Sequence, residues 1–330
     1  MKALVTGGTG FIGANLVRLL LDEGLSVRVL VRPESQRTNL DGLDVECVLG
    51  DLRDPHSLTR ALQGCNALFH AAASYVFWTR NPSAVYETNV GGTRNILSAA
   101  LEAGIEKVVY TSTESTIGVP AGALGSEEHV SSVDSLYGDY KKSKLLAERV
   151  ALEMAGRGLP VTIVNPTMPI GAWDIKPTPT GQVVVDFLNG RMPAYVNTGL
   201  NVIDVADVAR GHLLALERGR EGERYILGHQ NLTLRELLGG LGAVTGRRAA
   251  NVRIPLGLAV AAGAVDELVR GKMLKRHPRI ALAAVRTARK IRHFDCSKAV
   301  KELGLPQSPL EGALTRAVAW FRERGYVRMT

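Results

Sequence analysis

The chain has 330 residues, 45% of them hydrophobic and 22% charged, which is typical of a globular protein and excludes a disordered or fibrous one. Its net charge of +8 fits an anionic partner, such as a phosphorylated cofactor or a membrane surface, or a basic surface without a specific role. The three cysteines are far apart, so we expect no disulfide scaffold, no metal site and a reducing, cytoplasmic compartment. We expect no signal peptide, because a strand pattern begins at residue 2, and no membrane span, because no run of about 18 apolar residues occurs.

β-Branched runs alternate with helical patterns through the first half of the chain, which is typical of a parallel sheet built from strand–helix–strand units. After residue 166 the chain becomes rich in Pro, Thr and Gly, and its last third is expected to be mainly helical. We predict strands at about 2–6, 26–31, 44–49, 66–70, 106–111, 160–165 and 223–227, helices at about 11–23, 55–63, 82–103, 136–157 and 181–190, and a strand followed by a helix over about 201–217.

A glycine-rich segment, GGTGFIG at residues 7–13, follows the first predicted strand and opens the first predicted helix. In that context Gly7 permits a tight turn, Gly10 lets a pyrophosphate approach the backbone, and Gly13 lets the helix pack close to the strand. The phosphates would meet the free N–H groups and the positive end of the helix. The sequence therefore predicts an α/β fold with a doubly wound parallel sheet of the Rossmann type. It would bind a dinucleotide through Gly7, Thr9, Gly10, Phe11, Ile12 and Gly13.

The end of the second predicted strand bears on the choice of dinucleotide. Arg32 stands there, where an acidic residue would bind the ribose hydroxyl of NAD. Because an arginine pairs with the 2′-phosphate of NADP, we predict a preference for NADP(H), with NAD(H) as the second choice. The alternative is a solvated arginine beside the turn at Pro33.

Two further strand ends are candidates for the same site. Asp51 follows the third strand, and its carboxylate would accept a hydrogen bond either from an adenine amino group or from its own loop; the sequence leaves both open. Small residues at 71–73 follow the fourth strand and would let the backbone pass close to the cofactor. His70, just before them, is expected to be a packed histidine rather than a proton carrier.

The predicted helix at 136–157 carries a candidate proton-transfer pair. Tyr140 and Lys144 are four residues apart and therefore project from one face of the helix. A nearby ammonium would lower the pKa of the phenol from about 10, which would suit it to exchange protons with a carbonyl or hydroxyl. Tyr137 and Lys141 form a competing pair at the same spacing. At the end of the fifth strand, one hydroxyl of residues 111–113 is expected to hold a substrate oxygen.

Together these residues resemble the extended short-chain dehydrogenase/reductases, the NAD-dependent epimerase/dehydratase family, over nearly the whole chain. Within that family the chain is most similar to the dihydroflavonol-reductase-like branch and to the hopanoid-associated sugar epimerases. The resemblance lies in residues 7–13, 89–93, 140–144, 204–209, 294–299 and 320–321, and for the closer match in 164–167, 174–181 and 185–196.

The resemblance implies a role for each matching residue. Tyr140 would be the general acid/base, Lys144 would hold the nicotinamide ribose and lower the tyrosine pKa, and Thr113, preferred over Ser112, would be the catalytic hydroxyl. Asn89 would brace the neighbouring helix. The remaining cofactor contacts would be Asp51, Leu52, Ala71, Ala72, Ala73 and Pro166. The substrate pocket would contain Tyr75, Phe77, Trp78, Ser112 and Asn165.

The same resemblance implies a domain organisation and an oligomer. Residues 1–166 would form the NAD(P)-binding domain, with residues 200–228 returning to its sheet, and residues 167–330 would form the mainly substrate-binding part. A homodimer would pair through helices spanning about 85–103 and 137–156.

One departure from the family bears on the substrate. Nucleotide-sugar enzymes of the family tend to carry a diphosphate-binding arginine where this chain has Leu200, although Arg191 could act from another position. We therefore predict an NADP(H)-dependent carbonyl reductase or hydroxyl dehydrogenase for a small molecule, without a nucleic-acid partner. The alternatives are a sugar epimerase that retains its cofactor and a non-catalytic NADP-sensing protein.

The stretch 254–293 is apolar up to Val269 and strongly basic from Arg270 onward. Such a pair of segments would rest on an anionic membrane or shelter a lipid-like substrate. A buried helix followed by a solvated basic face is the interpretation that the sequence favours.

Overall fold

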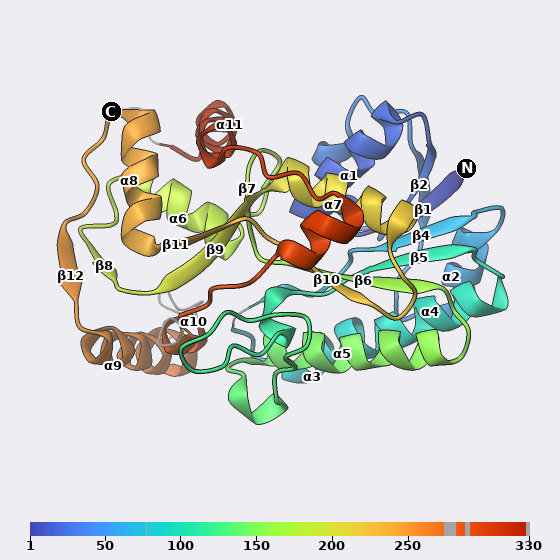
Figure 1. Ribbon diagram of the computed structural model, residues 1–330, viewed down its shortest axis with the longest axis horizontal. Helices are drawn as coiled ribbons and strands as arrows, with labels where there is room; N and C mark the ends of the chain where they lie inside the picture. Colours follow the sequence, from blue (N-terminus) through green and yellow to red (C-terminus); the bar gives the residue numbers. More distant parts are fainter. Residues whose placement is uncertain (77, 274–281, 288–290, 328–330) are drawn as a thin grey trace.

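The structure is a computed structural model that describes residues 1–76, 78–273, 282–287 and 291–327 (Figure 1). A seven-stranded sheet forms the larger part, with strand order β3-β2-β1-β4-β5-β6-β10 and every neighbouring pair parallel. In that order the strands are Glu46–Leu49, Ser26–Val31, Lys2–Thr6, Ala67–His70, Lys107–Thr111, Val161–Pro166 and Arg224–Leu227. The predicted α/β fold is thus confirmed, and its winding reverses between β1 and β4, where such sheets bind ligands.

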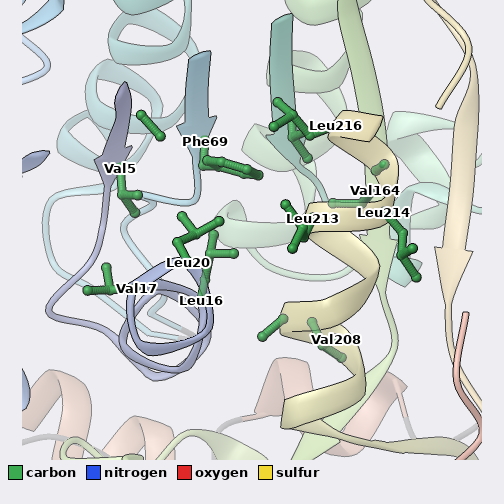
Figure 2. Close-up of a cluster of buried hydrophobic side chains, with 14 of the residues drawn as sticks. Val5, Leu16, Val17, Leu20, Phe69, Val164, Val208, Leu213, Leu214 and Leu216 are labelled. Carbon is green, nitrogen blue, oxygen red and sulfur yellow. The ribbon is translucent and has the colours of Figure 1, made fainter. Parts of the chain in front are cut away.

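Helices cover both faces of this sheet (Figure 1). On one face lie α1 (Phe11–Asp22) and α7 (Val205–Arg218), whose apolar sides bury leucines and valines against Val5 and Phe69 (Figure 2). On the other lie α2 (Pro55–Leu62), α4 (Gly92–Glu102) and α5 (Asp139–Gly156). Burying a leucine or valine side chain contributes about 1.5–3 kcal/mol, so these two clusters hold the strand ends in fixed positions.

The helix predicted over 82–103 is divided. It consists of α3 (Pro82–Tyr86), a π-helical turn at Glu87–Gly91, and α4. Asn89 lies in that turn, and its amide donates to Ser143 Oγ of α5 at 2.9 Å and exchanges hydrogen bonds with the backbone of Ser74. It therefore ties the loop after β4 to the helix that carries Tyr140.

A smaller part packs beside the carboxyl edge of the sheet. Its core lies between β7 (Met168–Ile170), β9 (Gly199–Asp204) and β11 (Gln230–Thr233), which form a mixed sheet, and helices α6 (Pro179–Leu188), α8 (Leu234–Thr245) and α11 (Leu310–Glu323). A parallel pair, β8 (Ala194–Val196) and β12 (Val252–Ile254), and helices α9 (Leu256–Asp266) and α10 (Leu282–Thr287) complete it.

Two expectations need correction here. The strand at 199–204 pairs with β7 and β11, so β10 and α7 return to the large sheet but β9 does not. The last third also contains β11 and β12, which were not predicted. The segment Gln230–Thr233 is mostly polar and half-exposed, so it lacks the apolar alternation that would reveal a strand.

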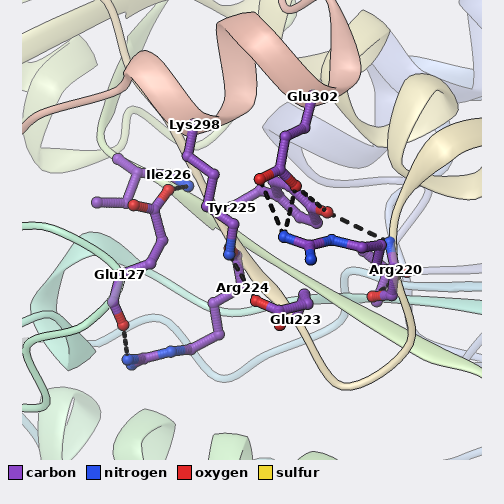
Figure 3. Close-up of polar contacts among 9 residues, drawn as sticks. Glu127, Arg220, Glu223, Arg224, Tyr225, Ile226, Lys298 and Glu302 are labelled. Carbon is purple, nitrogen blue, oxygen red and sulfur yellow. Dashed lines mark hydrogen bonds and ion pairs between the residues drawn. The ribbon is translucent and has the colours of Figure 1, made fainter.

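Polar contacts anchor the C-terminal segment to the edge strand β10 (Figure 3). The Glu302 carboxylate accepts hydrogen bonds from Arg220 Nη2 and Tyr225 Oη, each at 2.9 Å. Lys298 Nζ donates to Glu223 Oε2 at 2.6 Å. Among the described residues, no helix is both long enough and apolar enough to cross a membrane.

Candidate active site

A cavity of about 200 Å³ lies where the carboxyl ends of β1, β4 and β5 face the smaller part. It brings together the start of α1, the loop after β4, the end of β5 and the start of α5. Its lining residues are Gly7, Gly10, Phe11, Ile12, Gly13, Ala71, Ala73, Tyr75, Thr111, Ser112, Thr113, Tyr140, Lys144, Pro166, Thr167, Pro169 and Thr178.

The glycine-rich loop has the close contacts that its sequence predicts. Gly7 has a φ of +76°, and a Cβ there would lie 2.7 Å from the backbone nitrogen of Ala72. A Cβ on Gly13 would lie 2.1 Å from the carbonyl oxygen of Gly7. Larger residues would therefore displace the loop from the strand and helix that hold it.

The start of α1 offers hydrogen-bond donors to the cavity. Gly10 is the N-cap residue, and in the described structure no side chain caps this helix and no acidic residue occupies its first turn. The first N–H groups and the positive end of the helix dipole are thus available where Gly10, Phe11, Ile12 and Gly13 line the cavity. This arrangement fits the pyrophosphate of a dinucleotide, as the sequence predicts.

Asn39 supports this loop in a way that the sequence did not reveal. Its buried side-chain amide donates to the carbonyl oxygens of Thr9 at 3.1 Å and Trp173 at 3.0 Å. It thereby joins the glycine-rich loop to Trp173, which lies 134 residues after Asn39 in the chain. Thr9 itself is not among the cavity-lining residues.

The predicted adenosine contacts lie outside the cavity. Arg32 is exposed at the end of β2 and forms an ion pair with Glu34 at 3.3 Å. The Asp51 carboxylate accepts hydrogen bonds from Arg53 Nε and Nη2 and from the backbone of Arg53, which lowers the pKa of Asp51. Of the two partners expected for Asp51, the structure therefore shows its own loop. Leu52 is buried against Gly92.

Tyr140 lies at the start of α5 and faces the cavity together with Thr113. The two side chains are hydrogen-bonded. The Tyr75 ring packs edge-on against the Tyr140 ring, with centroids 4.5 Å apart. Burial raises the pKa of Tyr140 well above the usual value for a phenol, with a further contribution from the Glu114 carboxylate, and the hydrogen bond with Thr113 only partly opposes this. The phenol is thus protonated at neutral pH.

Lys144 is fully buried one helical turn after Tyr140. Its Nζ donates to Tyr110 Oη at 2.9 Å and to the carbonyl oxygen of Thr111 at 2.7 Å. Burial lowers the pKa of Lys144 to about 7, so this ammonium loses its proton more readily than an exposed lysine does. The expected lowering of the Tyr140 pKa by Lys144 is consequently not seen, because desolvation of both groups dominates.

The competing pair lies elsewhere. Neither Tyr137 nor Lys141 lines the cavity. Lys141 Nζ donates to Thr287 Oγ1 of α10 at 3.0 Å, and burial lowers the pKa of this lysine to about 8.

The three hydroxyls at the end of β5 have different surroundings. Thr111 Oγ1 bonds to His212 Nε2 at 2.9 Å. Thr113 bonds to Tyr140 and caps the short turn that follows it. Ser112 Oγ is buried without a hydrogen-bond partner among the described residues, although Ser112 lines the cavity. An unsatisfied hydroxyl at this place suits a polar group of a ligand.

The predicted substrate pocket is placed only in part. Tyr75 and Ser112 line the cavity, Trp78 does not, and Phe77 lies outside the described residues. Pro166, which was predicted to contact the cofactor, also lines the cavity. Asn165 is fully buried and donates to Thr116 Oγ1 at 2.9 Å and Glu148 Oε2 at 2.8 Å, so it supports the end of β6 instead of lining the pocket.

Three lining residues were missed: Thr167, Pro169 and Thr178. Thr178 had a sequence signal, because a threonine before Pro179 is typical of a helix N-cap, and its side chain does cap α6. The ion pair between Glu114 and Arg292 had none, because the two residues are 178 positions apart.

Comparison with known proteins identifies the family of this chain. The model of the NAD dependent epimerase/dehydratase family matches residues 3–228. A Synechocystis sp. protein, named provisionally as a dihydroflavonol 4-reductase, is 50% identical over 98% of this chain and 95% of its own length. Sterol demethylase protein B of Methylococcus capsulatus is 38% identical over 99% of this chain and 100% of its own length. The structure of a nucleoside-diphosphate-sugar epimerase from Pseudomonas aeruginosa, 31% identical, has a TM-score of 0.83 over 99% of both chains. These names cover different activities, so the site must inform the choice between them.

Proposed function

The chain belongs to the NAD-dependent epimerase/dehydratase family and is an NAD(P)-dependent, dihydroflavonol-reductase-like enzyme. We propose that it reduces a carbonyl group of a small molecule with NADPH, and that Tyr140 donates the proton. One observation carries the proposal: the protonated Tyr140 phenol and the donor-rich start of α1 line one cavity.

The residues present fit a nicotinamide dinucleotide. The glycine-rich loop would hold its pyrophosphate against α1, the small residues Ala71 and Ala73 would leave room beside β4, and Lys144 and Ser112 would supply polar contacts deeper in the cavity. When bound, the nicotinamide exchanges a hydride with a carbon atom.

The protein's own part in the reaction is the proton. A carbonyl that gains a hydride needs a proton on its oxygen, and a phenol whose pKa is raised by burial is in the donating form at pH 7. Thr113 would orient both the phenol and the substrate oxygen, since its side chain already bonds to Tyr140. The Tyr75 ring would limit access of water to Tyr140.

Arg32 supports NADP(H) over NAD(H). Its only ion pair in the described structure is an exposed one with Glu34, and such pairs contribute about 0–1 kcal/mol. The guanidinium can therefore leave Glu34 for a phosphate at little cost, and a charge-assisted bidentate contact with phosphate is stronger.

The surroundings of Leu200 and Arg191 argue against a nucleotide-sugar substrate. Leu200 packs with the core of the smaller part and offers no charge. Arg191 lies 3.7 Å from the Asp186 carboxylate. Neither residue lines the cavity, so the described chain has no arginine there to neutralise a diphosphate. Sugar epimerisation, including the hopanoid-associated type, stays the alternative because a relative of known structure is named as an epimerase.

The test is a screen of ketones, aldehydes, sterol ketones and sugars with NADPH and NADH, followed by absorbance and product analysis. A reductase consumes one NADPH for each product formed. Sugar turnover without net NADPH consumption would identify an epimerase instead. Tight NADPH binding with no turnover of any compound would favour the non-catalytic alternative.

A further inference from the structure

Helix α9 leaves large apolar side chains exposed. Leu258 is 64% and Val265 61% exposed, and the buried residues of this helix are the small Ala259 and Gly263. A helix that packs on a core buries its large apolar side chains and exposes polar ones. The exposed apolar surface continues through Leu268, Val269 and Met273. A surface of this kind marks a contact with something apolar.

The sequence that follows this surface is strongly basic. Residues 270–293 include nine Lys and Arg residues and no Asp or Glu, against two acidic residues, Asp266 and Glu267, at the end of α9. Asp266 forms an ion pair with Arg270. Within the described structure, Arg253 on the strand before α9 and Arg286 in α10 are exposed. Basic side chains bordering exposed apolar ones are complementary to a surface that is apolar inside and anionic outside.

We propose that α9 docks this protein on an anionic membrane surface. Its apolar side chains would enter the boundary between headgroups and acyl chains, and the basic residues nearby would meet the headgroups. A second copy of the chain is a poorer occupant, because pairing two such surfaces would bring like charges together. The contact is peripheral, since no described helix can span a bilayer.

The docking surface is linked to the active site. Helix α9 packs against α10, and Thr287 of α10 accepts the hydrogen bond from Lys141, the residue after Tyr140. Arg292 forms an ion pair with Glu114, next to Thr113. A membrane bound at α9 would therefore lie on the side of the molecule where the smaller part closes the cavity.

The experiment is co-sedimentation of the full chain with vesicles of phosphatidylcholine alone or with about one-third phosphatidylglycerol. We expect at least tenfold stronger binding to the anionic vesicles, falling as the salt concentration rises from about 0.05 M to about 0.5 M. The double variant Leu258→Ser/Val265→Ser should lose about tenfold or more of that affinity. Leu49→Ser/Val300→Ser, which changes an exposed leucine and valine far from α9, is the matched control and should bind as the unmodified chain does.

Circular dichroism and the mass in solution complete the test. Unchanged spectra and unchanged mass for both double variants, with a loss of vesicle binding in the α9 variant alone, support the proposal. Equal binding of the α9 variant, or no preference for anionic vesicles at any salt concentration, overturns it. A fall in the solution mass of the α9 variant without vesicles would show that a second copy covers this surface, and that also overturns it.

Discussion

Tyr140 in the first turn of α5 and Tyr137, two residues before that helix begins, provide a matched pair of substitutions. Tyr140→Phe removes only the hydroxyl that faces the cavity, so the fold and NADPH binding should survive while turnover falls by about 10² or more. Tyr137→Phe should retain most of the activity, because Tyr137 does not line the cavity. Steady-state rates with a substrate from the screen measure both. An active Tyr140 variant beside an inactive Tyr137 variant would reverse the assignment.

Arg32 determines the cofactor preference in our proposal, and a charge reversal tests it. Arg32→Asp would repel the 2′-phosphate of NADP and offer a carboxylate to the ribose of NAD, so the ratio of the two dissociation constants should invert. Fluorescence titration with NADPH and NADH gives both constants. Equal affinities in the unmodified protein would contradict the role of Arg32.

Single residues differ in how far the sequence could place them. The spacing of Tyr140 and Lys144 put both at the cavity, because helical periodicity is local. Their pKa values could not be foreseen, since they depend on burial by segments far away in the chain. Asn165 shows the same limit: it stands at a strand end, yet Thr116 and Glu148 hold it inside the protein.

At the scale of elements, the segment before α6 carries a buried carboxylate. Asp174 accepts hydrogen bonds from the backbone and hydroxyl of Thr178, and burial raises the pKa of Asp174 to about 7 from 3.8. The folded protein therefore holds a proton that the unfolded chain releases between about pH 4 and pH 7. The stabilising contribution of this group is present at low pH and is lost as the pH rises through 7.

Asp174→Asn removes that titration. We compare the free energy of unfolding of the variant with that of the unmodified protein at each pH. This difference should rise by about 1–3 kcal/mol in favour of the variant from pH 5 to pH 8. Urea unfolding measures it, and the other titrating groups, such as His70 and His212, contribute equally to both proteins. Asp134→Asn at an exposed position is the control and should show no such change. A pH-independent difference for Asp174→Asn would show that this carboxyl is not the titrating group.

The elements themselves were predictable where the pattern was strong. All seven strands of the large sheet were expected, because strands covered on both faces, such as β1 and β4, are short apolar runs. Strands β11 and β12 were missed because they are short, polar or exposed and exist only through their partners β9 and β8. The π-helical turn that divides the helix at 82–102 also has no sequence signal.

At the scale of the whole molecule, the face of the sheet covered by α4 and α5 is where we expect a second copy to pack. The two helices contact each other along the outside of this layer. Arg94 of α4 forms a bidentate ion pair with Glu153 of α5, with N···O distances of 2.8 and 2.9 Å. Leu152, beside that pair, is 39% exposed. Lys141 at the other end of α5 bonds to Thr287 of α10, which packs against α9, so this face adjoins the α9 surface at that end.

Light scattering at micromolar concentration should give twice the 35.4 kDa mass of the chain. Leu152→Arg should shift the protein toward the monomer, because in a symmetric interface each copy would bring its new charge close to Arg94 and to the other copy's arginine. Leu49→Arg places the same charge at a more exposed site (55%) on β3, the strand at one edge of the sheet, and should leave the mass unchanged. A monomeric unmodified protein would contradict the dimer, and a dimer that survives Leu152→Arg would place its interface on another face.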